Sequence, residues 1–335
     1  MELETVLYRV EGNVGIVSLN RTKALNAMSK QIFVDLTTAF DAAEKDDTVR
    51  CVVVNAEGRA FCAGGDIPEM KGLDNPEAVF DFYNVAGIFM KKMINFVKPT
   101  ITVAHGAIAG AGTSLLLAGD IALVSDDAMF MVAFGAVGLI PDCAGHWLLP
   151  RACGLNMAKE LMMTQRAVKA PEMKELGLCN HVYPKEQLMD EAMKLANKIA
   201  KGPLNCYSSS KLILNKSFET NLEDLLKEET EAQAAARLHP NGDEGLAEEK
   251  GQLPVSCSRF PVGENRGSMQ YSYEMNILLS NLGSTVSPCC PVLFISYDSA
   301  GSFLKKGLAS FVNIVYNAKR SPPGGRKKTC GGEQK

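Results

Sequence analysis

The sequence carries little net charge and few aromatic residues. Both features limit the kinds of molecule that the protein surface could bind. Its 335 residues have a formal net charge of −3 and a single Trp. Proteins that bind nucleic acid or anionic membranes through their surface usually present a clear excess of positive charge. We therefore expect neither nucleic acid nor a membrane as a partner.

The cysteines lack the spacing of metal sites and disulfide frameworks. Ten are scattered along the chain, no C-x-x-C occurs, and only Cys289 and Cys290 are adjacent. Zinc sites and small secreted domains use closely paired cysteines. We expect reduced thiols and no metal.

Targeting signals and long hydrophobic runs are also missing. The first residues, MELETVLYRVEGNVG, contain early acids and no apolar core, and the last, GGEQK, form no peroxisomal signal. The longest apolar run, AIAGAGTSLLLAGDIALV, is interrupted by Asp120 and is too short for a membrane span. The expected location is the cytoplasm.

Strands and helices alternate along the first part of the chain. Residues 5–20 read as two strands joined by a turn, and a helix with Ser29 as its N-cap follows. Continuous apolar strands such as VRCVVVNA and PTITVAHG are typical of strands buried on both faces. This alternation predicts an α/β fold with a largely parallel sheet.

The composition divides the chain into three regions. We expect an α/β core over residues 1–185 and a helical region over 186–250, where the pattern is helical almost throughout. From residue 251 the periodicity disappears and Ser, Gly, Pro and Cys become frequent. Residues 251–335 are expected to form a divergent, largely disordered tail.

Two glycine-rich loops follow predicted strands: GRAFCAGGDIPEM at 58–70 and HGAIAGAG at 105–112. Glycines there let backbone N–H groups approach a ligand, although they are equally consistent with tight turns. The third glycine of a dinucleotide fingerprint is replaced by Leu115, and no Gly-Lys-Ser/Thr loop occurs. Nucleotide binding is therefore disfavoured.

Five segments, in the same order along residues 1 to about 250, resemble the enoyl-CoA hydratase/isomerase (crotonase) superfamily. They are NRTKALNAMS, VRCVVVNAEGRAFCAGGDIPEM, KPTITVAHGAIAGAGTSLLLAGD, GLIPDCAGHWLLPRACG and AKELMMTQRAVKAPEMKELGLCNHVYP. The resemblance implies a crotonase-like spiral of repeated ββα units with a C-terminal helical region that assembles a homotrimer or a dimer of trimers. It also implies an acyl-CoA thioester substrate, so that coenzyme A belongs to the substrate and no separate cofactor is expected.

The resemblance also assigns an oxyanion hole. Losing an α-proton from a thioester requires stabilisation of the enolate oxygen, which two preorganised N–H donors supply. By the family's pattern these donors belong to Gly65 and Ala111. The CoA pocket would be lined by Lys23, Ala24, Leu25, Ala63, Asp66 and Ile67, although Asp66 alone reads more readily as a helix cap.

The acid that moves the proton is the distinctive feature. Hydratases of the family carry two glutamates, and their positions here hold Ser114 and Phe134, neither of which can act as a base unaided. The segment GLIPD-x-x-G-x-W-x-LPR resembles epoxyphenylacetyl-CoA isomerases and enoyl-CoA isomerases. The resemblance implies that Asp142 shuttles a proton between acyl carbons.

Other interpretations of these residues stay open. Asp142 could cap a helix that begins near Ala144, and its pKa would be raised by burial but lowered by a following helix N-terminus. His146 could orient Asp142, but a solvated or packed histidine is the more common case. His105 reads as structural, and Cys62 and Cys143 read as small packing residues.

The predicted function is an acyl-CoA isomerase, acting on an enoyl double bond or a ring epoxide, in fatty acid metabolism or aromatic catabolism. The alternatives are a hydratase or hydrolase of the same fold and a non-catalytic CoA-binding scaffold. The segment DEGLA at 243–247 is not followed by the family's usual closing sequence. This departure reflects either a divergent tail or a change of reading frame, and it puts trimer packing in question.

Overall fold

The computed structural model describes residue 1 and residues 3–242. The predicted tail at 251–335, and the DEGLA segment at 243–247, lie outside these described residues.

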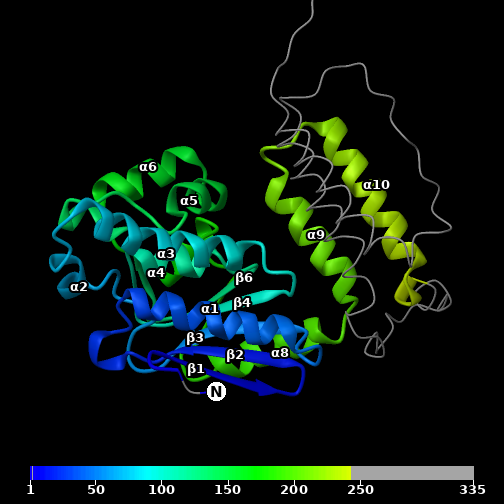
Figure 1. Cartoon of the computed structure of the whole chain (residues 1–335), viewed down its shortest axis with the longest axis horizontal. Coiled ribbons are helices and arrows are strands. Elements are labelled where there is room, and N and C mark those ends of the chain that lie inside the picture. Colours follow the sequence, from blue (N-terminus) through cyan, green and yellow to red (C-terminus); the bar gives the residue numbers. More distant parts are fainter. Residues whose placement is uncertain (2, 243–335) are drawn as a thin grey trace, which may run out of the picture. The chain divides into compact units, whose positions relative to one another are not determined.

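A six-stranded sheet forms the centre of the molecule, with the strand order β1-β2-β3-β4-β6-β9 (Figure 1). Only the β1–β2 hairpin is antiparallel, and every later pair is parallel. The strands are Val6–Glu11, Val14–Leu19, Cys51–Ala56, Thr100–Ala104, Ile121–Ser125 and His181–Tyr183. The predicted α/β fold with a largely parallel sheet is confirmed.

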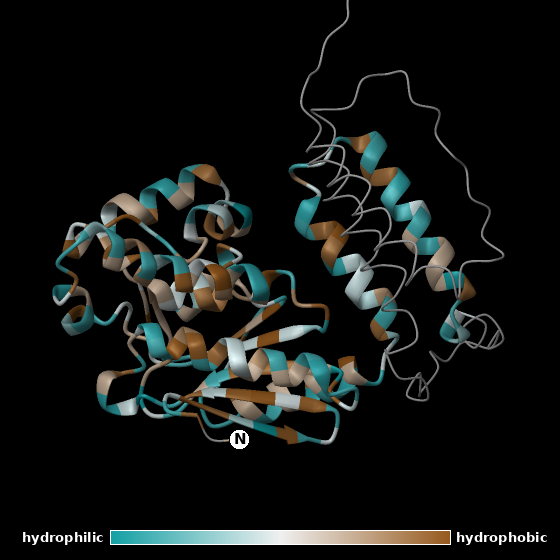
Figure 2. Ribbon diagram, in the orientation of Figure 1, coloured by the Kyte–Doolittle hydropathy of each residue, from teal (hydrophilic) through white to brown (hydrophobic). Residues whose placement is uncertain are grey.

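Helices cover both faces of this sheet, which explains its apolar strands (Figure 2). Val52 and Val54 of β3 belong to the core beneath α1 (Lys30–Lys45) and α3 (Pro76–Ile94). Cys51 and Val53 alternate with them and belong to the core beneath α8 (Leu188–Ala200). Because side chains of a strand alternate between faces, a strand buried on both sides must be continuously apolar.

The N-cap predicted for the first long helix is confirmed. The Ser29 hydroxyl accepts a hydrogen bond from the Ile32 N–H at 3.3 Å, at the start of α1. This bond satisfies one of the donors that a helix leaves free at its first turn.

A second, three-stranded sheet escaped the sequence analysis. It has the order β5-β7-β8 and consists of Ala107–Ala109, Met129–Met131 and Val168–Lys169. Strands of two or three residues are too short to show an alternating pattern. Strand β5 lies inside the second glycine-rich loop, so this small sheet helps to hold the site.

The remaining described elements are short helices around the site and a helical C-terminal region. They are η1 (Thr22–Ala24), α2 (Ile67–Lys71), α4 (Ala111–Leu117), η2 (Ala133–Val137), α5 (Gly145–Cys153), α6 (Leu155–Thr164), α7 (Ala170–Glu175), α9 (Leu204–Lys216) and α10 (Leu222–Leu238). Helix α9 is tied to the core by an ion pair at 2.9 Å between Lys211 and Asp120. No helix in the described part of the chain is both long and apolar enough to cross a membrane.

Candidate active site

Backbone pairing joins the two glycine-rich loops. The Cys62 N–H donates to the Ala107 carbonyl at 3.1 Å, and the Ala109 N–H donates to the Cys62 carbonyl at 2.8 Å. A Cβ added to Gly112 would lie 2.7 Å from the Cys62 Cβ, which is closer than side-chain atoms can approach. Glycine is therefore required at 112 because the loops are in direct contact.

The Gly65 N–H has no partner because the two residues beside it, Gly64 and Asp66, form the backbone hydrogen bonds to Met28. The Met28 N–H donates to the Gly64 carbonyl at 2.7 Å, and the Asp66 N–H donates to the Met28 carbonyl at 2.9 Å. Successive backbone groups of an extended segment point to opposite sides, so Gly65 faces away from Met28. Within residues 3–242 its N–H has no hydrogen-bond partner.

The Ala111 N–H is free for a different reason. Ala111 is the first residue of α4, whose N-cap is Gly110, and the first N–H groups of a helix have no partner inside it. No other described residue accepts from this N–H. A Cβ on Gly110 would lie 3.3 Å from the Gly64 Cα, so the residues that precede the two free donors touch each other. Two unpaired N–H donors thus lie on adjoining loops, as an oxyanion hole would need.

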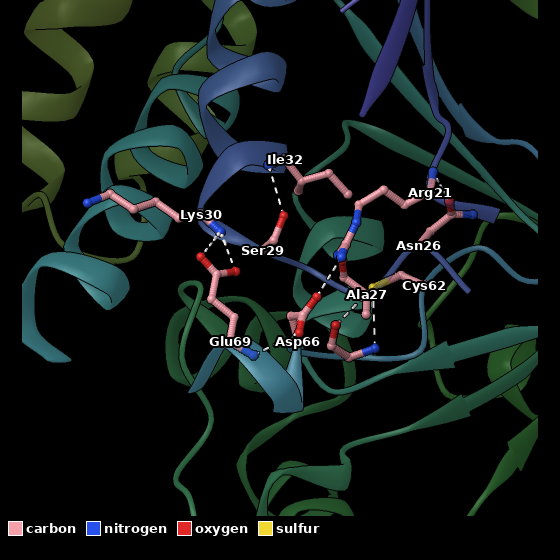
Figure 3. A network of polar contacts seen from close by, with 10 residues as sticks. Arg21, Asn26, Ala27, Ser29, Lys30, Ile32, Cys62, Asp66 and Glu69 are labelled. Carbon is pink, nitrogen blue, oxygen red and sulfur yellow. Dashed lines mark hydrogen bonds and ion pairs between the residues drawn. The ribbon is translucent and has the colours of Figure 1, made fainter. Parts of the chain in front are cut away.

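The Asp66 side chain holds the first loop in place (Figure 3). It caps α2 by accepting from the Glu69 N–H at 3.0 Å, and it forms an ion pair with Arg21 at 2.7 Å. Burial acts to raise the pKa of Asp66, but the Glu69 N–H and Arg21 outweigh it and leave the pKa lowered. The carboxylate stays ionised, and both of its oxygens have hydrogen-bond partners within the protein. This is what the helix-cap interpretation predicts.

The other residues predicted to line the CoA pocket lie on segments that pack together. The Ala63 N–H donates to the Leu25 carbonyl at 3.0 Å, which joins the η1 segment to the first glycine-rich loop. Lys23, Ala63 and Ile67 are exposed, and Ala24 and Leu25 are half-buried. These residues form a surface beside Gly65, the free donor of that loop.

Asp142 does not cap the helix that follows it, so that alternative is wrong. Helix α5 begins at Gly145, and its N-cap is Ala144, a residue in the left-handed conformation with φ 61° and no side-chain bond to the helix. Cys143 is also left-handed, with φ 51°. One oxygen of the Asp142 carboxylate, Oδ1, is buried and has no hydrogen-bond partner among the described residues.

Burial decides the acidity of Asp142. It raises the pKa of the carboxyl group, and hydrogen bonds from the Cys143 thiol and from the Asp142 N–H offset the rise only in part. A buried carboxylate with a raised pKa binds a proton more readily than a solvated one, which suits a group that must accept and return protons.

The segment that carries Asp142 rests on the first turn of α4. The Ser114 hydroxyl donates to the Asp142 carbonyl at 3.2 Å. Ser114 follows Ala111 by three residues, and residues three apart lie on the same side of a helix. Asp142 is therefore held over the helix turn that provides the Ala111 donor. Phe134, at the second hydratase position, is buried in η2.

Neither histidine takes a direct part in this arrangement, and neither cysteine supplies a thiolate. His146 is exposed, and no described hydrogen bond links it to Asp142. The His105 ring bonds the Gly58 carbonyl at 2.9 Å, as expected for a structural residue. Burial raises the pKa of Cys62 to about 12 and also raises that of Cys143, so neither is a thiolate near neutral pH.

Tyr83, a half-buried residue of α3, was not among the predicted site residues. Its hydroxyl lies 3.5 Å from the Met70 sulfur. Burial raises the pKa of Tyr83, and the negative charge of Asp142 raises it further. Tyr83 stands in an ordinary amphipathic helix outside every recognised motif, so only the packing of α3 reveals its proximity to Asp142.

The described residues contain no group of three or more His, Cys, Asp or Glu side chains that could hold a metal ion.

Comparison with known proteins identifies the fold and the family. Residues 9–255 match the family model described as enoyl-CoA hydratase/isomerase. The chain belongs to this family. It is similar to 1,2-epoxyphenylacetyl-CoA isomerase of Escherichia coli, with 33% identity over 73% of this chain and 95% of that protein.

Relatives with a different activity match almost as well. A short-chain-enoyl-CoA hydratase of Clostridium acetobutylicum is 31% identical over 69% of this chain and 89% of its own. The crystal structure of an enoyl-CoA hydratase from Polaromonas is 30% identical, with a TM-score of 0.70 over 72% of this chain and 95% of its own. The family resemblance inferred from the sequence is confirmed, and the relatives include both isomerases and hydratases.

Proposed function

We propose that the protein is an acyl-CoA isomerase that moves a proton from one acyl carbon to another through a thioester enolate. The observation that carries the proposal is the buried, unpartnered carboxylate oxygen of Asp142. A base that both takes and returns a proton needs no second acid to activate water. The serine and phenylalanine at the two hydratase positions support this single-base chemistry.

The roles follow from the geometry. The thioester oxygen binds between the N–H groups of Gly65 and Ala111, which strengthen their hydrogen bonds as negative charge develops on it. Asp142 takes a proton from the acyl carbon and returns it to another carbon. Phe134 and the apolar residues around it exclude water from the site. Coenzyme A enters as part of the substrate, along the surface formed by Lys23, Ala24, Leu25, Ala63 and Ile67.

The products formed in water labelled with heavy oxygen test the reaction class. Purified protein is incubated separately with 3-enoyl-CoA, 2-enoyl-CoA and epoxyphenylacetyl-CoA, and the products are analysed by mass spectrometry and NMR. An isomerase produces a compound of unchanged mass without heavy oxygen. A mass increase of one water identifies a hydratase, and free coenzyme A identifies a hydrolase. Binding without any product supports the non-catalytic alternative and contradicts the proposal.

We also propose that copies of the chain assemble through the C-terminal helices, as a homotrimer or a dimer of trimers. Helix α10 buries none of its own residues in the described chain. Apolar residues are exposed along α9 and α10 (Figure 2), namely Leu214, Leu222, Leu226 and Leu238, and Phe218 is exposed in the turn between the two helices. Light scattering of the purified protein measures the assembly, and Leu222→Asp is expected to weaken it. A monomer in the unaltered protein would contradict this part of the proposal.

A further inference from the structure

A pocket of about 800 Å³ lies along α3 and the segment before it. The pocket is open to solvent, and most of its wall surface is apolar, from residues such as Leu73, Val79 and Phe80, while Asp74, Asn75 and Asn84 add polar groups. A wall of this kind favours an apolar acyl group. Tyr83 places a hydroxyl group in this wall.

The Tyr83 hydroxyl is linked to the first glycine-rich loop through one side chain, that of Met70. It is 3.5 Å from the Met70 sulfur, and the Met70 methyl group lies 3.1 Å from where a Cβ on Gly65 would stand. One methionine side chain thus separates the hydroxyl from the Gly65 donor. If a thioester oxygen is held at Gly65, as proposed, the Tyr83 hydroxyl is therefore only one side chain away from that end of the substrate.

The hydroxyl is poorly satisfied within the protein. A thioether sulfur is a weak acceptor, and it is the only hydrogen-bond partner of Tyr83 within the described chain. Burial and the Asp142 charge raise the pKa of Tyr83, so the group remains protonated near neutral pH. It can therefore donate a hydrogen bond to a better acceptor but cannot act as a base.

We infer that Tyr83 is a specificity-determining residue that donates a hydrogen bond to an oxygen on the acyl group, and that the substrates are acyl-CoA thioesters whose largely apolar acyl group carries an oxygen near the reacting carbons. The inference rests on the proposed function for the placement of the thioester. The contact is a hydrogen bond, and no covalent bond forms or breaks at Tyr83.

A matched pair of thioesters isolates this contact. Phenylacetyl-CoA and 2-hydroxyphenylacetyl-CoA differ by one ring oxygen placed next to the carbon that bears the side chain. Calorimetry measures the Kd of both compounds for the unaltered full-length protein and for Tyr83→Phe, which keeps the ring and removes the hydroxyl. Tyr183→Phe, in strand β9, is the matched control. Together the four affinities form a cycle in which only the oxygen–hydroxyl contact fails to cancel.

The expected result is a preference for the hydroxylated compound that Tyr83→Phe reduces by about three- to tenfold, the worth of one neutral hydrogen bond. Tyr183→Phe should leave the preference unchanged. An identical ratio of affinities in the unaltered protein and in Tyr83→Phe would overturn the inference.

Exchange of the α-proton in heavy water separates this inference from the proposed function. If the protein binds both compounds with the expected ratio but exchanges neither α-proton, the proposed enolate chemistry fails while the role of Tyr83 in recognition stands. If both compounds exchange and Tyr83→Phe changes neither the affinity ratio nor the exchange ratio, the inference fails while the enolate chemistry stands.

Discussion

In the two glycine-rich loops, the groups that face the site are backbone N–H donors, whereas the segment 138–144 contributes a side chain. The loops are held by strand-like hydrogen bonds and by glycines in contact, and these backbone contacts fix Gly65 and Ala111 in place. The acid segment contains two residues in the left-handed conformation, Cys143 and Ala144. Another of its residues, Ile140, has 76% of its surface exposed.

This difference separates the groups proposed to stabilise the enolate from the group proposed to decide which reaction follows. Backbone donors recognise any thioester oxygen, so they serve isomerases and hydratases equally well. A carboxylate acts only where its own loop places it. The outcome of the reaction is therefore expected to depend on Asp142 and its support from Ser114, and the following changes test each region against the other.

The largest effect is expected from Asp142→Asn. Asparagine keeps the size of the side chain but cannot take a proton, so kcat for isomerisation should fall roughly 10²- to 10⁴-fold. Affinity for acyl-CoA should hardly change, because the thioester is held by the loops. Rates of product formation and of α-proton exchange measure the effect, with the exposed Asp126→Asn as control. Unchanged α-proton exchange in Asp142→Asn would contradict the assignment of Asp142 as the base.

Ala111→Pro should produce the next largest effect. Proline is favoured at the first position of a helix, and it removes an N–H that α4 does not use. We expect kcat/KM to fall about 10²- to 10³-fold, as for the loss of one oxyanion donor.

Leu155→Pro provides the control for that change, because Leu155 is also the first residue of a helix with a glycine N-cap. Circular dichroism should show folded protein for both variants. Full activity in a folded Ala111→Pro protein would contradict the oxyanion assignment.

The pH dependence of kcat/KM should reveal the pKa of Asp142, which burial raises. The group must be ionised to accept a proton, and its pKa in the folded protein is raised by burial. We expect kcat/KM to fall about tenfold per pH unit below that pKa, which lies above the usual value of about 3.9. A rate that stays constant down to the usual range of an aspartate would show that another group, or a solvated carboxylate, limits the reaction.

Ser114→Ala should have a smaller effect, because it removes one hydrogen bond to the backbone of the acid segment. We expect a loss of about three- to tenfold in kcat, with the overall fold unchanged. The same substitution in the Asp142→Asn background should cost nothing further if Ser114 acts through Asp142. An equal loss in both backgrounds would assign Ser114 an independent role.

The smallest effect concerns stability. Because the pKa of Asp142 is raised on folding, its contribution to stability is present below the unfolded pKa and is lost as pH rises through the folded pKa. At neutral pH the ionised group therefore costs stability. At neutral pH the free energy of unfolding of Asp142→Asn should equal that of the unaltered protein or exceed it by about 1 kcal/mol, although the variant is inactive. Denaturant titration of both proteins measures this difference. Clear destabilisation would show that the carboxylate has a structural partner.

Much of the architecture was predictable because it depends on local patterns. Continuous apolar strands, the Ser29 cap and the amphipathic helices follow from the spacing of residues a few positions apart. The two free donors were located from the resemblance of the loops to a known family. The small sheet containing β5 was not found, because its strands are shorter than any recognisable repeat.

The sequence by itself determined the α/β class and the family, because many short-range signals agree along some 250 residues. Tertiary structure alone decided the state of the individual side chains. It showed that one oxygen of Asp142 is buried without capping α5, that His146 is exposed, and that the charge of Asp142 acts on Tyr83. The burial of these side chains, their pKa values and the distances between them depend on groups that α3, α4 and α5 bring together. The linear sequence does not show which of these groups will be neighbours.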